Sequence, residues 1–306
     1  MSSPRTAQAL VDRIERVVQA DVGRNISALC AAAGGGLWGA ASSLAAALPC
    51  RVGLITGFFV PLGMPPAAET DGPVGAALLA RGFAEIGIPC RLATDEPCCS
   101  ACTVALAAAD AGAAPVDAVA IGAPLAGLIE TWRAAGITYA VSIERCGRSC
   151  DGSPRNMRGE DISAHTAPLD DLFTAGPWDR IAIGDGGNEI GMGALLPELI
   201  GRHVDHGEVI ACVTPANHLI VAGVSHWGAY ALLGALAVIR ADWRRPLLCC
   251  LDEALDRHIL EVMLRDGPAV DGVSRRQTLT IDNFDLRFHH EKLRMIRALV
   301  EAEHAV

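Results

Sequence analysis

A glycine-rich segment, residues 183–193, combines an anion-binding type of backbone with two carboxylates. It reads Ile-Gly-Asp-Gly-Gly-Asn-Glu-Ile-Gly-Met-Gly and follows a short apolar stretch. We expect a helix over residues 191–200, and successive N–H groups at a helix start can cradle an anion. Glu189, however, stands where a dinucleotide fingerprint beginning at Gly184 would need its third glycine. The segment therefore indicates an ammonium group or a metal ion as the ligand. The residues expected to act here are Asp185 and Glu189 as catalytic groups, with Gly186, Gly187 and Asn188 as substrate contacts.

Residues 142–163 form a second charged loop, which follows a predicted strand. Four carboxylates and four arginines occur within it, together with three glycines that allow repeated turns. Arginine side chains fork onto carboxylates, whereas acidic side chains suit proton transfer or a metal ion. We expect Asp151 and Asp161 to be catalytic. The substrate-binding residues expected from this loop are Glu144, Arg145, Arg148, Asn156 and Arg158.

Two shorter loops carry further candidates. Residues 65–73 place two carboxylates beside prolines, although threonine and aspartate before a helix are also ordinary capping residues. Residues 225–228, Ser-His-Trp-Gly, open a helix after an apolar run, and a buried histidine beside a packed tryptophan is the alternative interpretation there. The substrate-binding residues expected from these loops are Glu69, Thr70, Asp71, Gly72, Ser225 and His226.

The eleven cysteines are odd in number and lie in apolar stretches as well as in loops. This usage, with no signal-peptide pattern at the start of the sequence, indicates a reducing, cytoplasmic compartment. Cys99 and Cys102 supply a single C-x-x-C, which is not the paired set of a zinc or iron–sulfur site. We expect reduced, non-catalytic cysteines. An amino-acid racemase that uses Cys146 and Cys150 as its acid–base pair is an alternative.

The elements that must position these loops alternate along the chain. Strands are predicted over residues 52–59, 116–121, 139–143 and 180–183, and helices over residues 7–19, 74–86 and 124–135. Short strands that are apolar on both faces and alternate with helices predict an α/β fold. We expect a mostly parallel, Rossmann-like sheet with helices on both faces and with the four loops at the carboxyl ends of its strands. Residues 219–239 are interpreted as a buried strand-to-helix passage rather than a membrane span, and residues 282–306 as a closing C-terminal helix.

Composition bounds the function. The 306 residues carry a formal net charge of -10, which disfavours a nucleic-acid partner. Lys292 is the single lysine. A P-loop needs a Gly-Lys pair and a pyridoxal enzyme needs a Schiff-base lysine, so both classes of protein are disfavoured. No linker or fixed-period repeat divides the sequence, and we expect one domain over residues 1–306. Homo-oligomerisation is left open.

Six strings in this order resemble the D-glutamate cyclase family. They are TGFFV at 56–60, ETDGP at 69–73, SIER at 142–145, DGSPRNMRGEDIS at 151–163, GDGGNEIGMG at 184–193 and S-x-W-G at 225–228. The resemblance covers nearly the whole chain and is to the catalytic C-terminal domain of the family. His226 stands where the family pattern usually has asparagine, and Asn217 where it often has aspartate.

The resemblance implies a lyase that converts D-glutamate to 5-oxo-D-proline and water by intramolecular amide formation. A small-molecule amino acid is then the partner, with no nucleic acid and no membrane. Such chemistry needs a base for the amine, an acid for the departing oxygen and a cation for the α-carboxylate. A binding module that recognises an amino acid without turnover is the alternative. No cofactor is implied, but magnesium, manganese or calcium would suit the carboxylate oxygens. The residues that offer such oxygens are Asp71, Asp151, Asp161, Asp185 and Glu189.

Overall fold

The structure is a computed structural model, which describes residues 4–302. Its centre is a six-stranded sheet with the order β5-β4-β1-β6-β7-β8, and every strand pairing in it is parallel. Counted along the chain, this is the 3-2-1-4-5-6 order of the doubly wound Rossmann fold. The predicted α/β class is confirmed. The six strands are β1 (Val52–Ile55), β4 (Cys90–Asp95), β5 (Val116–Val119), β6 (Tyr139–Ile143), β7 (Asp179–Gly184) and β8 (His218–Val221).

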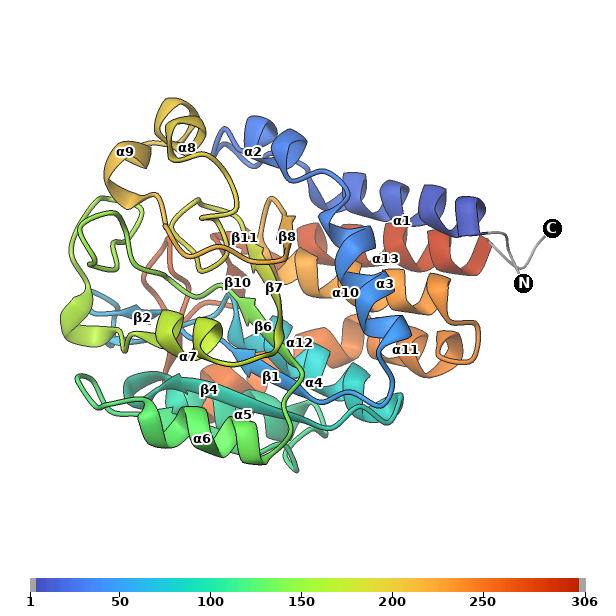
Figure 1. The fold of residues 1–306 in the computed structure, drawn as a ribbon, viewed down its shortest axis with the longest axis horizontal. Coiled ribbons are helices and arrows are strands. Elements are labelled where there is room, and N and C mark those ends of the chain that lie inside the picture. Colours follow the sequence, from blue (N-terminus) through green and yellow to red (C-terminus); the bar gives the residue numbers. More distant parts are fainter. Residues whose placement is uncertain (1–3, 303–306) are drawn as a thin grey trace.

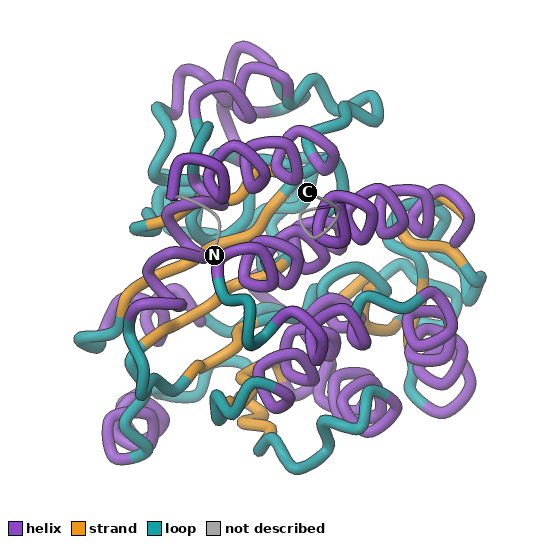
Figure 2. Tube along the Cα trace, turned by 90° about the vertical axis from the view of Figure 1, so that its right-hand side faces the viewer, coloured by secondary structure: helices purple, strands orange, loops and turns teal. Residues whose placement is uncertain are grey.

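Both faces of the sheet are covered because the central strands are apolar on both sides. Leu54 and Val141 belong to the hydrophobic core on one face, whereas Ile55 and Ala140 belong to the core on the other. Side chains alternate along a strand, so two cores require apolar residues at successive positions. Figure 2 shows the strands running side by side between helices.

The larger core lies under eight helices. In Figure 1, α1, α3, α10 and α13 lie side by side to the right of the sheet. Helix α10, buried along its length except at its last residue, is the centre of this layer and contacts α1, α3, α4, α11 and α13. The helices of this face are α1 (Pro4–Val18), α3 (Gly36–Ala46), α4 (Pro73–Glu85), α5 (Cys99–Ala108), α10 (Ser225–Ile239), α11 (Arg244–Cys250), α12 (Glu253–Asp266) and α13 (Leu286–Ala302).

The opposite face carries a smaller core under shorter helices. These are α2 (Ser27–Ala32), α6 (Ala126–Ala134), α7 (Leu169–Ala175), α8 (Pro197–His203) and α9 (Gly207–Ile210). Helix α4 follows β1 on the first face, and α7 follows β6 on the second face. The connections that follow these two neighbouring strands therefore cross to opposite faces of the sheet, which opens a crevice outside the carboxyl ends of the strands. The loops with candidate chemistry follow these strands.

Two small sheets lie beyond the central one. Strand β2 (Phe59–Val60) pairs with β3 (Ala67–Glu69), and β3 pairs with β9 (Ala269–Val270). Strand β10 (Thr280–Ile281) forms a hairpin with β11 (Phe284–Asp285) just before α13. The single-turn helices Glu96–Cys98 and Ser163–His165 complete the elements. These parts bring residues near 60, 270 and 280 together at one side of the crevice.

Most predicted elements are confirmed, with two errors at glycines. The predicted strand over 52–59 is divided, because Gly57 adopts a φ of 107° between β1 and β2. The predicted helix over 191–200 is wrong: Gly191 has a φ of 105°, and α8 begins only at Pro197. The C-terminal helix is confirmed from Leu286, while residues 303–306 of that prediction lie outside the described part. The passage over 219–239 is β8 followed by α10, and no helix within residues 4–302 is long and apolar enough to cross a membrane.

Gly53 in β1 leaves room for the indole ring of Trp132, which offers a test of the packing. A Cβ at this position would lie 2.2 Å from Cζ3 of Trp132, whose Nε1 donates to Asp117 at 2.9 Å. This hydrogen bond holds the indole ring, so the ring cannot move away from an added Cβ without losing the bond. We expect Gly53→Ala to lower the free energy of unfolding by about 1–3 kcal/mol in urea titrations, the range for overpacked cores. Gly127→Ala in α6, where nothing lies within 4 Å, is the control and should not destabilise. Equal stability of the two variants would contradict this packing.

Candidate active site

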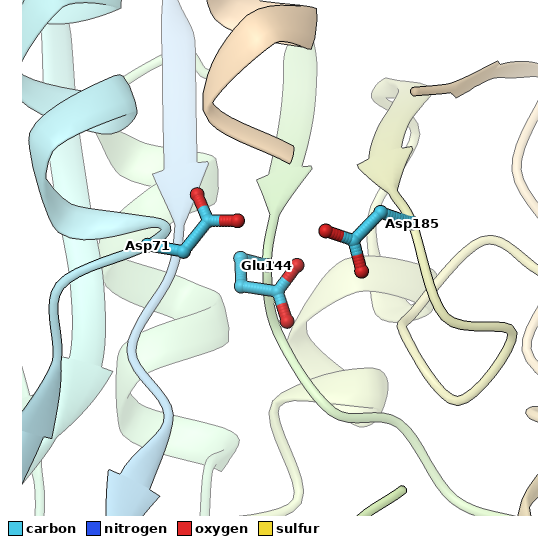
Figure 3. A group of neighbouring side chains, drawn as sticks. All are labelled: Asp71, Glu144 and Asp185. Carbon is cyan, nitrogen blue, oxygen red and sulfur yellow. The ribbon is translucent and has the colours of Figure 1, made fainter. Parts of the chain in front are cut away.

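Three carboxyl groups from different loops meet at the carboxyl ends of the central strands. Asp71 precedes α4, Glu144 follows β6 and Asp185 follows β7. One oxygen from each lies within 4.8 Å of the others, and all three side chains are buried. Figure 3 shows the three side chains next to one another at the strand ends. The prediction that these loops converge at this edge of the sheet is confirmed for these residues.

Ser225, at the first turn of α10, contacts all three groups. Its backbone N–H donates to Oδ2 of Asp71 at 3.1 Å and to Oδ2 of Asp185 at 3.0 Å. Its hydroxyl donates to Oε2 of Glu144 at 2.5 Å. The N-terminus of a 15-residue helix also favours negative charge nearby. Ser225 therefore holds the carboxyl groups at a fixed spacing.

Arg24 supplies the nearest positive charge, and sequence reasoning missed it. It lies in the connection between α1 and α2, where no motif marks it. Its guanidinium forms ion pairs with Asp185 and with Asp282, the latter at 2.7 Å. Asp282 was also missed as a site residue. It comes from the turn between β10 and β11, so the site depends on both ends of the chain.

Glu69, Asp71, Glu144, Asp185 and Asp282 form what we name the acidic cluster. Burial raises the pKa of every member, and repulsion between the carboxylates raises it further. The pKa of Asp185 rises to about 6 and that of Asp282 to about 7, although Arg24 opposes both shifts. One guanidinium cannot neutralise five carboxylates. The cluster therefore holds protons near neutral pH.

A pocket with a cavity volume of about 230 Å³ opens onto this cluster. Its apolar walls come from the β2 region and from the 157–162 loop, and its cationic groups are three arginines. A larger hollow of about 470 Å³ lies at the opposite ends of the strands, but most of its lining residues are apolar, and Asp110 is its single acidic residue. The charged side chains therefore favour the smaller pocket as the candidate active site. Its charged lining residues are Arg24, Glu69, Glu144, Arg158, Glu160, Asp185, Glu189, Arg275 and Asp282.

Several predicted catalytic and substrate-binding residues lie at this pocket or just beneath it. Glu69, Glu144, Asn156, Arg158, Asp185, Asn188 and Glu189 line it. Asp71 and Ser225 lie directly beneath through the contacts given above. Gly72 has a φ of 87° and lies so close to Thr56 and Glu144 that a Cβ would clash with both. Thr70 is buried and donates its hydroxyl to the carbonyl of Thr280, which ties the loop to β10.

Asp151 and Asp161 do not join the acidic cluster. Both are exposed and lie outside the pocket lining. Asp151 accepts hydrogen bonds from Ser149, Ser153 and Arg155, and these bonds lower its pKa. Asp161 accepts a hydrogen bond from the N–H of Ser163. The structure therefore does not bring these two predicted catalytic residues to the pocket, because local turns of their own loop use their carboxylates.

Arg145 and Arg148 are likewise turned to other partners. Arg145 is fully buried, and its guanidinium donates to Asp95 and to the carbonyls of Gly57 and Ala167. Arg148 pairs with Asp171 at the surface. Neither lines the pocket, so neither is placed to bind a substrate carboxylate there. The sequence shows the arginines but not their partners.

Glu189 and His226 have internal partners. Glu189 accepts hydrogen bonds from the N–H groups of Asp185, Gly186 and Gly187, at 2.6 to 3.0 Å. The loop thus binds its own carboxylate instead of an external anion, and no helix begins there. The ring of His226 contacts Asp256 and Tyr230, both at 2.7 Å, in the core beneath α10. These bonds favour supporting roles for both residues.

The cysteines give no sign of an acid–base pair at the site. Cys146 is buried and Cys150 is exposed, and neither lines the pocket. Burial raises the pKa of the Cys146 thiol well above its ordinary value, which disfavours the thiolate. All eleven cysteines are free thiols in the structure. The racemase alternative gains no support from this arrangement.

Residues 14–299 match the family described as D-glutamate cyclase-like, C-terminal. The chain belongs to this family. The matched range contains Arg24, Ser225 and the whole acidic cluster. The resemblance inferred from the six strings is confirmed.

A curated relative in the D-glutamate cyclase-like family is the human protein D-glutamate cyclase, mitochondrial (Homo sapiens). It is 45% identical over 105 residues, which are 33% of this chain and 17% of the human protein. The match thus spans about a sixth of that relative's length. The named activity belongs to the human protein and comes to this chain only as a proposal.

The buried Asp95–Arg145 pair predicts a large structural effect. Asp95→Asn would leave the guanidinium buried and unpaired, and we expect it to lower the free energy of unfolding by about 3–5 kcal/mol. Urea denaturation followed by circular dichroism measures this. Asp242→Asn, which breaks an exposed pair with Arg240, is the control and should leave the midpoint nearly unchanged. Similar small effects in both variants would show that Arg145 has no structural role.

Asp282 predicts how stability depends on pH. Its pKa rises from the ordinary 3.8 to about 7, so between these values the folded protein binds a proton that the unfolded chain does not. The resulting stabilisation is fully present below about pH 4 and is lost as the pH rises through about 7. We expect the free energy of unfolding to fall from pH 5 to pH 8, and to fall less in Asp282→Asn. Asparagine tolerates the φ of 54° at this position.

Asp285→Asn is the control for this pH series. Arg287 lowers the pKa of Asp285 to about 2, so its protonation affects stability only at lower pH. The control should keep the wild-type slope between pH 5 and pH 8. An Asp282→Asn variant with that same slope would show that Asp282 takes up no proton on folding.

Proposed function

We propose that this protein is an enzyme that cyclises D-glutamate to 5-oxo-D-proline with release of water. The observation that carries the proposal is the buried, proton-holding acidic cluster on the floor of the pocket in a chain of the D-glutamate cyclase-like family. A carboxylate floor suits the substrate's ammonium group. Arginines on the same pocket suit its carboxylates.

The reaction balances without a net proton. An ammonium group and a carboxylate become an amide and water, so one C–N bond forms, one C–O bond breaks and two protons pass from nitrogen to the departing oxygen. The nitrogen that loses the protons and the oxygen that accepts them are bound to the same carbon atom once the ring closes. A group of carboxyls with neighbouring pKa values can accept protons at one member and donate them at another. The acidic cluster has this property.

Asp185 is the proposed base. Its pKa of about 6 leaves it ionised near neutral pH, and Ser225 and Arg24 hold it in place. It would take a proton from the ammonium group, which lies among Asp71, Glu144 and Asp185. The free amine can then attack the γ-carboxyl carbon.

The proposed acid comes from the same cluster. Glu69 and Asp282 line the pocket and have raised pKa values, with that of Asp282 at about 7. A neutral carboxyl group can protonate the oxygen that leaves as water. Burial keeps such a group neutral, which is why the same environment that disfavours charge supports acid catalysis.

A divalent cation is a separate proposal for the same floor. The oxygens of Asp71, Glu144 and Asp185 are close enough to one another for magnesium, manganese or calcium. Dialysis against a chelator, followed by addition of each metal, measures whether a cation contributes to activity or to melting temperature. The steps above use only side chains of the protein.

Asp185→Asn tests the proposed function. We expect the rate of cyclisation to fall by about 10²- to 10⁴-fold, because the amide cannot accept the proton, while the melting temperature stays close to wild type. Release of 5-oxo-D-proline is measured by chromatography. Asp179→Asn, at the amino-terminal end of the same strand, is the control and should keep full activity. A wild-type protein that binds D-glutamate without forming the ring would instead establish a binding module.

A further inference from the structure

Three arginines line the pocket, and their surroundings differ. Arg24 is neutralised by Asp185 and Asp282. Arg158 is exposed on the 142–163 loop. Arg275 is half-buried, and its guanidinium has no ion pair or hydrogen bond with any residue in the described range 4–302. A partly desolvated guanidinium without a partner is available to an anionic ligand.

The backbone at Arg275 is fixed in an unfavourable conformation. Its φ is 61°, in the left-handed region that a side chain with a Cβ seldom adopts. Its N–H donates to the carbonyl of Asp271 at 2.7 Å, and its carbonyl accepts the N–H of Met64 at 2.8 Å. Strain of this kind persists where the surroundings impose it, and it is concentrated at functional sites.

Asp271 fixes the loop from inside. Its buried carboxylate accepts hydrogen bonds from the N–H groups of Val273 and Ser274 and, on its other oxygen, from Thr280 and Asn283. The same side chain therefore joins the Arg275 loop to the turn that carries Asp282. The arginine and a member of the acidic cluster are held as one unit.

The Arg275 loop also packs directly on the acidic cluster. A Cβ on Gly272 would lie 2.1 Å from Oε1 of Glu69, so only glycine allows this approach. The loop thus forms the wall of the pocket beside Glu69. A cation on this wall faces a ligand whose ammonium group lies on the carboxylate floor.

We propose that Arg275 binds the α-carboxylate of the amino-acid substrate. The inference rests on the proposed function and specifies how the substrate is oriented. With the α-carboxylate on Arg275 and the ammonium group on the floor, the γ-carboxyl can fold back toward the amine. The α-carboxylate is unchanged by the reaction and is present in the product too. Arg275 therefore contributes equally to ground-state and transition-state binding, which sets KM rather than kcat.

The test compares Arg275→Gln and Arg275→Lys with wild type. Both variants keep a Cβ, so the backbone strain is matched. We expect Arg275→Gln to raise KM for D-glutamate and Kd for 5-oxo-D-proline by about 10- to 100-fold, with kcat within a few-fold of wild type. The lysine variant keeps the charge but loses the forked geometry, so its KM and Kd should lie between those of wild type and Arg275→Gln. Binding is measured by calorimetry and turnover by chromatography.

The α-amide of 5-oxo-D-proline is the decisive probe. It lacks the carboxylate, so wild type should bind it more weakly than the acid by about the same factor. Arg275→Gln should bind amide and acid alike, a result that general damage to the fold would not produce. Arg276→Gln is the matched control, because its neighbouring side chain is exposed and does not line the pocket.

Three outcomes would overturn the proposal. Wild-type binding that is equal for acid and amide would show that no cation recognises the carboxylate. Unchanged acid binding in Arg275→Gln, with a loss in Arg158→Gln, would assign the anchor to Arg158. Equal effects of the Arg275 and Arg276 variants would indicate a nonspecific charge effect. If wild type distinguishes acid from amide through Arg275 but forms no 5-oxo-D-proline from D-glutamate, the anchor stands and the proposed function fails.

Discussion

Burial of five carboxyl groups around one guanidinium and one serine is the electrostatic constraint on which the rest of this structure depends. Carboxylates so close together repel one another, and removal from water adds to the cost of ionising each. Ser225 offsets part of this cost with a backbone N–H shared by Asp71 and Asp185 and a hydroxyl bound to Glu144. Arg24 offsets another part. The rest of the cost of ionisation is avoided because carboxyl groups of the cluster with raised pKa values can remain protonated.

The fold supports this arrangement in specific ways. Parallel strands end at one edge, so Glu144 and Asp185 emerge next to each other from β6 and β7. Glu144 adopts a φ of 42°, an uncommon conformation that turns the chain sharply at the strand end. Beneath it, the buried Asp95–Arg145 pair links β4 to the start of the 142–163 loop and to the carbonyls of Gly57 and Ala167. Rigid neighbours of this kind keep the carboxyl groups close despite their repulsion.

The glycine-rich segment after β7 stabilises its own loop and also places a site residue at the pocket. Its N–H groups point inward and bind Glu189 of the same loop. The loop is thereby closed by an internal anion, and Asp185 is left facing the pocket. The segment still brings Asp185 to the site, but through its own internal carboxylate rather than through an external phosphate.

The sequence by itself determined the α/β class, the strands β6 and β7 and the loops that carry Asp71, Glu144, Asp185 and Ser225, because apolar periodicity and glycine-rich loops are local properties. It could not determine which charges meet. Arg145 and Arg24 are both arginines near acidic residues in the chain, yet one is used by Asp95 in the core and the other by Asp185 and Asp282 at the site. Asp282 and Arg275 reach the pocket only because the segments around β9 and β10 fold back against β3. An ionisable side chain takes its role from the partners around it, and segments more than 100 residues apart supply those partners only in the folded chain.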